Sequence, residues 1–177
     1  MGGKEKMKAS ISEEAFLGLV LSSIEVYKLE CLGLLFGYRM NGGFAIEYAI
    51  PYQAADRTHA EVDIRSKYSR RLRTALTALQ KWELIGDFHS HPQYGNSKGN
   101  VSPSDADISD IDENSIFVIV AINDRKRQQY FEVNKDGTIS GVLGDHHIKI
   151  ACFYKENKKR IRRVHLTCQF ATGLYPD

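Results

Sequence analysis

The sequence has few cysteines and almost no net charge. Cys31, Cys152 and Cys168 are an odd number, no two of them form a CxxC pair, and each lies in an apolar stretch. These features disfavour a disulfide framework and a cysteine-based structural zinc site, and they predict buried free thiols in a reducing compartment. The formal net charge of +2 provides no general attraction to nucleic acid.

Long hydrophobic runs are missing as well. No segment approaches the roughly 20 apolar residues that a membrane-spanning helix needs. Near the start of the chain, Glu13 and Glu14 interrupt the pattern of a signal peptide, and Lys6 stands where a myristoylation signal needs Ser or Thr. No internal repeat or low-complexity tract occurs. We therefore expect a cytoplasmic globular protein in which residues 1–177 form one domain.

Hydrophobic periodicity predicts a mixture of helices and strands. A capping box at Ser10-x-x-Glu13 and helical spacing predict that the first helix begins near residue 11. Helices are predicted over 11–27, 66–82 and 105–112. Strands are predicted over 32–38, 44–50, 84–88, 115–122 and 128–133. The section after residue 148 predicts two further strands, or a strand and a helix.

Two histidines follow the predicted strand 84–88. His89 and His91 stand two residues apart, and such residues of a strand project from the same face, about 6.5–7 Å apart. Asp107 would come from the first turn of a helix that Ser102 or Ser104 caps. Two imidazoles and one carboxylate are typical of catalytic zinc, with the fourth tetrahedral position left to water. We predict one Zn²⁺ ion held by His89, His91 and Asp107.

Three segments together resemble the signature of a known family. Residues 30–37 contain a glutamate before a Gly-Leu-rich strand, residues 86–92 contain His-Ser-His-Pro, and residues 103–107 contain Ser-x-x-Asp. This order is similar to that of the JAMM (MPN+) metalloproteases, and the likeness extends over about residues 11–135. Residues 140–177 would then be a basic C-terminal extension. The chain looks like a compact prokaryotic-type member.

The resemblance implies a fold and an activity. The fold class would be α/β (α+β), with a curved central mixed β-sheet flanked by helices, as in the cytidine-deaminase-like folds. The activity would be that of a zinc-dependent isopeptidase or peptidase that cuts after the C-terminal tail of a ubiquitin-like protein. Glu30 would be the general base, and Ser104 would polarise the scissile carbonyl. Asp105 stands one residue outside the Ser-x-x-Asp register and is expected to serve the helix dipole.

Several alternatives stay open. Ser104 could serve only as a helix cap, and the capping and catalytic roles are hard to combine in one rotamer unless Ser102 takes the cap. The chain could be a catalytically silent binding or scaffold module, or a DNA-associated relative of the family. The cluster of basic residues between Lys155 and Arg163 is interpreted as a solvated turn, with a binding patch for an acidic partner as the second possibility.

Other polar segments receive structural interpretations. The stretch from Gln93 to Val101 is longer than the family's usual spacer, and its Gly, Asn and Ser content predicts mobility. It could be a surface insertion, or a flap beside the zinc with Tyr94 as a substrate contact. His59 is interpreted as a solvated loop residue. His146 and His147 are interpreted as an exposed pair, because neighbouring strand residues point to opposite faces.

Overall fold

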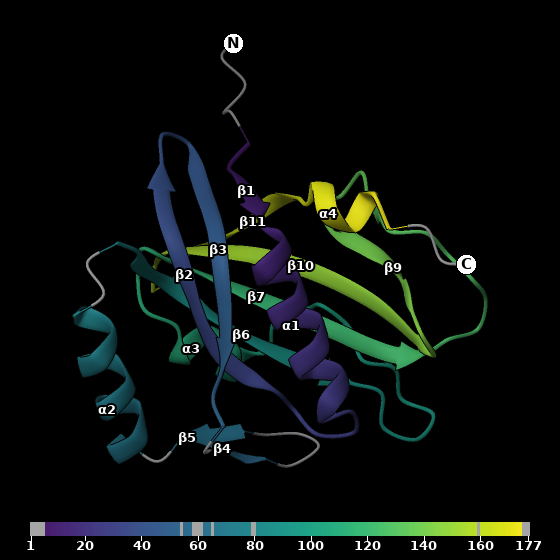
Figure 1. Ribbon diagram of the computed structural model, residues 1–177, viewed down its shortest axis with the longest axis horizontal. Helices are drawn as coiled ribbons and strands as arrows, with labels where there is room; N and C mark the ends of the chain where they lie inside the picture. The colour runs from purple at the N-terminus through teal and green to yellow at the C-terminus, as the bar shows by residue number, and fades with distance from the viewer. Residues whose placement is uncertain are drawn as a thin grey trace.

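The computed structural model describes residues 6–53, 55–57, 62–64, 66–78, 81–158 and 160–174. His59 lies outside these residues. The helices are α1 (Glu13–Glu25), α2 (Ser66–Thr77), α3 (Asp105–Asp110) and α4 (Gln169–Thr172) (Figure 1). The strands are β1 (Lys8–Ile11), β2 (Leu32–Met40), β3 (Gly43–Pro51), β4 (Ala55–Arg57), β5 (Val62–Ile64), β6 (Glu83–Pro92), β7 (Ser115–Asp124), β8 (Glu132–Val133), β9 (Ile139–Leu143), β10 (His146–Asn157) and β11 (Arg160–Thr167).

A mixed, curved sheet dominates the described residues. Its strand order is β11-β1-β3-β2-β6-β7-β10-β9-β8, and β4 and β5 form a separate small ribbon. β1 runs parallel to β3 and to β11, and β6 runs parallel to β7, whereas the other pairs are antiparallel. Because β11 also pairs with β10, the sheet curls back on itself. The α/β fold with a curved central mixed sheet is therefore confirmed.

Helix α1 covers one face of this sheet. Phe16 and Leu19 of the helix are completely buried, and they belong to the same apolar cluster as Val118 of β7 and Ile150 of β10. Burying side chains of this size contributes roughly 1.5–3 kcal/mol each. The packing of α1 against the central strands therefore supplies much of the core.

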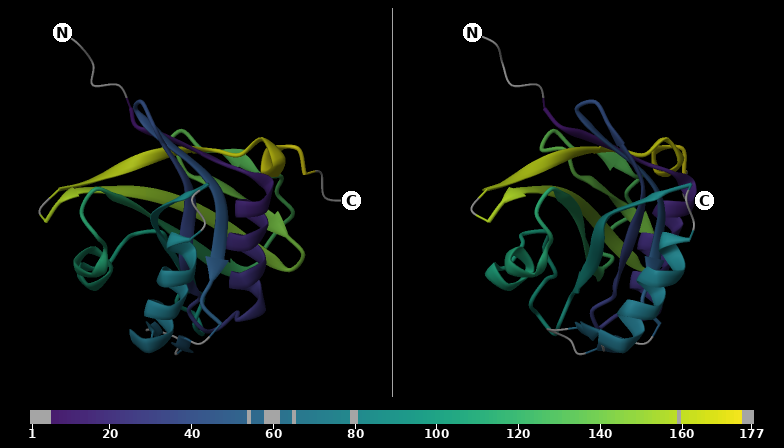
Figure 2. Two further views of the ribbon diagram at one scale, coloured as in Figure 1. Left: turned by 60° about the vertical axis from the view of Figure 1, so that its left-hand side comes forward. Right: turned by 90° about the vertical axis from the view of Figure 1, so that its left-hand side faces the viewer.

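The opposite face of the sheet carries α2 and α3. On β2, Leu34 alternates with the core residue Leu35 and so points the other way, where it packs with Phe36 and with Leu72 of α2. Ile111, just after α3, packs with apolar residues of β7 and β10. Figure 2 shows the hairpin of β10 and β11 extending above α3.

Tertiary pairing decided several element boundaries that the sequence pattern missed. β1 was not predicted, because four residues with two buried positions give almost no periodic signal. Ser10 lies in this strand, so the predicted capping box is wrong, and Ser12 caps α1 by accepting a hydrogen bond from the N–H of Ala15 at 3.0 Å. The predicted strand 128–133 contracts to Glu132–Val133.

The end of the described chain belongs to the main sheet. β9, β10 and β11 all pair within it, and β11 lies between β10 and β1. The basic segment after residue 140 is therefore an integral part of the fold. Cys31, Cys152 and Cys168 are buried free thiols, as expected. Among the described residues, no helix has the length and apolar character to cross a membrane.

Candidate metal centre

Strand β6 presents the two histidines on one face of the sheet. It continues through both residues to Pro92, four residues beyond the predicted end. His89 pairs with Leu32 of β2 and Ile119 of β7, and His91 pairs with Ala121 of β7. The alternation of a strand places both imidazoles on the side that carries α3. The prediction that the strand would bring the two rings together is confirmed.

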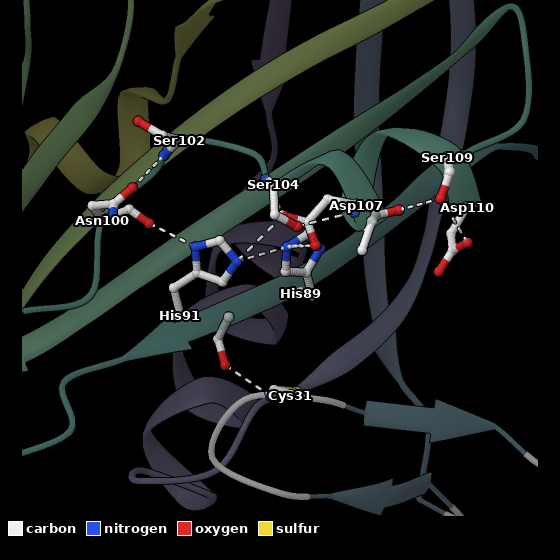
Figure 3. Close-up of polar contacts among 11 residues, drawn as sticks. Cys31, His89, His91, Asn100, Ser102, Ser104, Asp107, Ser109 and Asp110 are labelled. Carbon is white, nitrogen blue, oxygen red and sulfur yellow. Dashed lines mark hydrogen bonds and ion pairs between the residues drawn. The ribbon is translucent and has the colours of Figure 1, made fainter. Parts of the chain in front are cut away.

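Asp107 completes a compact group of possible ligands. Its Oδ1 lies 3.4 Å from Nε2 of His89, and its Oδ2 lies 3.6 Å from Nε2 of His91. The two Nε2 atoms are 3.1 Å apart, and the ligand atoms of all three residues lie within 4.8 Å of one another. Figure 3 shows the three side chains pointing toward one another. Among the described residues this is the one cluster of His, Cys, Asp and Glu that could hold a metal ion.

The backbone carbonyl of Asn100 orients His91. Nδ1 of His91 lies 2.8 Å from this oxygen, and because a carbonyl only accepts, Nδ1 carries the proton and donates it. Nε2 therefore keeps its lone pair on the side of His89 and Asp107. Burial lowers the pKa of His91, and the neighbouring His89 lowers it further. A neutral imidazole held in this tautomer suits a zinc ligand.

Asp107 is held by the start of α3. Its Oδ2 accepts a hydrogen bond from the N–H of Ser104 at 2.6 Å, and its own N–H donates to Oγ of Ser104 at 3.1 Å, which completes a capping box. Burial raises the pKa of Asp107, but the hydrogen bond and charge of His89 and the bonds from Ser104 outweigh it, so the pKa lies below its usual range. An anionic carboxylate therefore faces two imidazoles, a donor set that fits zinc.

Ser104, and not Ser102, caps α3. The N–H of Ser102 instead donates to Oδ1 of Asn100 at 2.8 Å. Although we expected capping to compete with a catalytic role, a hydroxyl has one donor and two acceptor positions. Accepting from the N–H of Asp107 leaves the hydroxyl proton of Ser104 able to donate elsewhere. Asp105 is exposed and lies outside the ligand group, as expected.

Ser90 connects the histidine strand to the segment that carries Glu30. Ser90 is fully buried, its Oγ accepts from the N–H of Cys31 at 2.8 Å, and its N–H donates to the carbonyl of Cys31 at 2.9 Å. This contact continues the antiparallel β2–β6 register by one residue beyond Leu32 and His89. One residue further along the same register, Glu30 lies opposite His91. Glu30 is half-buried. The contact was not predicted. The sequence did contain a signal for it, because a strand residue between His89 and His91 must point to the opposite face of the sheet.

The stretch from Gln93 to Val101, for which mobility was predicted, is anchored at several points. Tyr94 and Ser97 exchange two backbone hydrogen bonds of 2.9 Å, while Nδ2 of Asn123 donates to the carbonyl of Gly99 at 3.1 Å. A Cβ atom on Gly99 would come within 2.0 Å of the carbonyl oxygen of His91. The segment therefore lies directly against the backbone of the strand that carries His91.

The basic cluster between Lys155 and Arg163 is not one continuous exposed patch. Lys155 is only 5% exposed, and its Nζ donates to the carbonyls of Ile108 and Ile111, each at 2.7 Å. Arg160 and Arg162 both form ion pairs with Glu156. The interpretation of the whole cluster as a solvated turn or a binding patch is therefore wrong for Lys155, which holds the end of α3.

The neighbouring histidines His146 and His147 are half-buried, in contrast to the expected exposed pair. His146 packs edge-on against Tyr27, with ring centroids 4.6 Å apart. Neither residue belongs to the ligand group near His89.

Comparison with known proteins identifies the family to which this sequence is similar. A family model described as prokaryotic homologs of the JAB domain matches residues 12–133, a span that contains all five predicted site residues. No curated protein matches the chain. Among solved structures, the solution structure of protein DSY2949 from Desulfitobacterium hafniense has a TM-score of 0.62 and 18% sequence identity, and the match covers 91% of this chain and 92% of that chain. At this identity the likeness shows a shared fold.

Proposed function

We propose, on the premise that the chain belongs to the family of prokaryotic homologues of the JAB domain, that it is a zinc-dependent hydrolase of peptide or isopeptide bonds. The convergence of His89, His91 and Asp107 within 4.8 Å carries this proposal. The side chains of His91 and Asp107 remain 19% and 18% exposed, so a substrate can reach the group from solvent. A bound zinc ion would supply a Lewis acid that lowers the pKa of a coordinated water to ~7.

The residues around the group would keep it ready to bind the ion. Asn100 holds the proton of His91 on Nδ1, and His89 and Ser104 keep Asp107 ionised. His91 in this neutral tautomer and an ionised Asp107 have no proton to release from their ligand atoms when a metal binds. The capping box also fixes the carboxylate relative to α3.

Glu30 would act as the general base. Its neighbour Cys31 is hydrogen-bonded to Ser90 through both its backbone N–H and its carbonyl. In this register the next residue, Glu30, lies opposite His91. A carboxylate in this position would take a proton from the attacking water and pass it to the leaving amine. The oxygen of the Ser104 hydroxyl already accepts a hydrogen bond from the backbone N–H of Asp107. Its proton would be donated to the oxygen of the scissile carbonyl.

Membership of this family suggests a ubiquitin-like protein, or its conjugate, as the substrate. Its flexible C-terminal tail would lie extended in the site, with the bond after the tail being cut. A cytoplasmic location is supported by three buried free thiols, which suit a reducing compartment.

The test combines metal analysis with cleavage of a ubiquitin-like fusion protein. Glu30→Gln should keep one equivalent of zinc and its affinity for the substrate, while turnover should fall by about 10²–10⁴-fold, as is typical for loss of a general base. The exposed Glu25→Gln provides a matched control and should retain wild-type turnover. His89→Ala should lose both zinc and activity.

Three outcomes would contradict this proposal. Protein that carries zinc but cuts no ubiquitin-like fusion would favour a silent binding module. Loss of zinc in Glu30→Gln would make Glu30 a ligand or a support for one. A fall in turnover of less than tenfold would mean that another carboxylate is the base.

A further inference from the structure

A cavity of about 540 Å³ lies beside the candidate metal centre. Cross-strand partners in a sheet project to the same face. His91 of β6 pairs with Ala121 of β7, which pairs in turn with Lys149 of β10. Both Ala121 and Lys149 line the cavity, and so does Asn100, whose carbonyl accepts the hydrogen bond from His91. The cavity and the metal centre therefore occupy one face of the sheet and share Asn100.

The lining of this cavity has a surplus of positive charge. It contains five cationic side chains and two carboxylates, namely Lys98, Lys126, Arg127, Lys149, Arg163, Asp124 and Asp136. Asp136 is shared, since its Oδ2 lies 3.6 Å from Lys149 and 3.7 Å from Arg163. No ion pair among the described residues involves Lys98, Lys126 or Arg127, so these three cations remain available to a ligand.

The cations come from separate segments of the chain, and the charges of three of them act together on His147. Burial lowers the pKa of His147, a lining residue, and the charges of Lys98, Lys149 and Arg127 lower it further. Lys98 belongs to the segment before Asn100, Arg127 follows β7, and Lys149 lies on β10. The fold thus concentrates positive charge that is dispersed along the sequence.

We propose that this cavity binds an acidic segment of the protein substrate and thereby selects substrates with several carboxylates close to the scissile bond. The proposal rests on the proposed function for its substrate. Five cations around one concavity suit several anionic groups better than one carboxylate. A nucleic acid is the less suitable occupant, because no Phe, Tyr or Trp among the described residues lines the cavity to stack on a base and two carboxylates would face the phosphates.

Binding of a fluorescein-labelled, glutamate-rich peptide tests the proposal by fluorescence anisotropy. The double variant Lys98→Glu/Arg127→Glu should weaken binding by at least ~10-fold, because it reverses two unpaired charges of the lining. The double variant Arg70→Glu/Arg71→Glu alters the protein's net charge equally, on exposed positions of α2, and should bind within ~2-fold of wild type. The same peptide with glutamine in place of glutamate should not bind, and added salt should weaken binding.

The readout separates this proposal from the hydrolase itself. Peptide binding should persist in His89→Ala, and zinc content should persist in Lys98→Glu/Arg127→Glu, so either proposal can fail without the other. Unchanged thermal unfolding would show that the charge-reversal variant is folded, and Lys98→Gln/Arg127→Gln is the milder alternative. The proposal is overturned if the charge-reversal variant binds the peptide like wild type, or if single-stranded DNA binds more tightly than the peptide and loses affinity in that variant.

Discussion

The hydroxyl oxygen of Ser90 accepts a hydrogen bond from the backbone N–H of Cys31 at 2.8 Å, across 59 residues of sequence. Ser90 also donates its own N–H to the carbonyl of Cys31, so one buried residue binds both backbone polar groups of another. The serine lies between His89 and His91, and the cysteine follows Glu30. This pair therefore couples the strand of the candidate metal ligands to the proposed general base.

Replacing Ser90 should damage this coupling. In Ser90→Ala the buried N–H of Cys31 loses this acceptor, which should lower the free energy of unfolding by about 1–3 kcal/mol. Ser90→Thr keeps the hydroxyl and provides the matched control. We expect both variants to keep zinc and Ser90→Ala alone to lose turnover, as measured by denaturant unfolding and fusion cleavage. Equal stability of Ser90→Ala and wild type would show that the contact contributes nothing.

Gly99 should tolerate no side chain. A Cβ there would lie 2.0 Å from the carbonyl oxygen of His91, so Gly99→Ala should displace the segment that contains Asn100 and break its bond to His91. Loss of such a supporting hydrogen bond typically weakens metal affinity by ~10–100-fold. Competition with a zinc chelator measures the change. Gly173→Ala, whose added Cβ would meet no atom closer than 3.4 Å, should leave zinc affinity unchanged.

Asp107 combines two roles that substitutions can separate. Asp107→Ala should lose zinc together with the capping box, whereas Asp107→Asn should lose zinc but keep an oxygen that accepts from the N–H of Ser104. Ser104→Ala should keep zinc and lose about 0.5–2 kcal/mol of stability with the cap. Metal analysis and thermal unfolding distinguish the three variants. A chelator should lower the melting temperature of wild type but not of Asp107→Ala, because a metal that binds only the folded state stabilises it.

Lys155 should stabilise the end of α3, although its place in a basic stretch of the sequence suggested a role on the protein surface. In Lys155→Met the carbonyls of Ile108 and Ile111 lose their shared donor, and the end of α3 is released. We expect a loss of about 1–3 kcal/mol in unfolding free energy and weaker zinc binding, since α3 carries Asp107. Lys158→Met changes an exposed lysine of the same basic cluster and should alter neither quantity. Unaltered stability in Lys155→Met would refute this role.

The sequence by itself determined the two local pairs of the candidate metal centre. His89 and His91 are two residues apart on a strand, and Ser104 and Asp107 are three apart across a helix cap. Such short spacings translate directly into geometry, because the local backbone conformation alone decides which side chains share a face. The buried apolar strands were predictable for the same reason, and their hydrophobic runs correspond to β2, β3, β6 and β7.

Only the tertiary structure decided how the site is supported. The contacts from His91 to Asn100, from Cys31 to Ser90 and from Lys155 to Ile111 span 9, 59 and 44 residues. Each depends on how strands and loops pack together, and none produces a periodic pattern. The cavity beside the metal centre is decided in the same way, because Lys98, Arg127 and Lys149 meet only when β7 and β10 pair and the segment after β6 folds over them. Periodicity reports the conformation of one segment, whereas these contacts are made between segments.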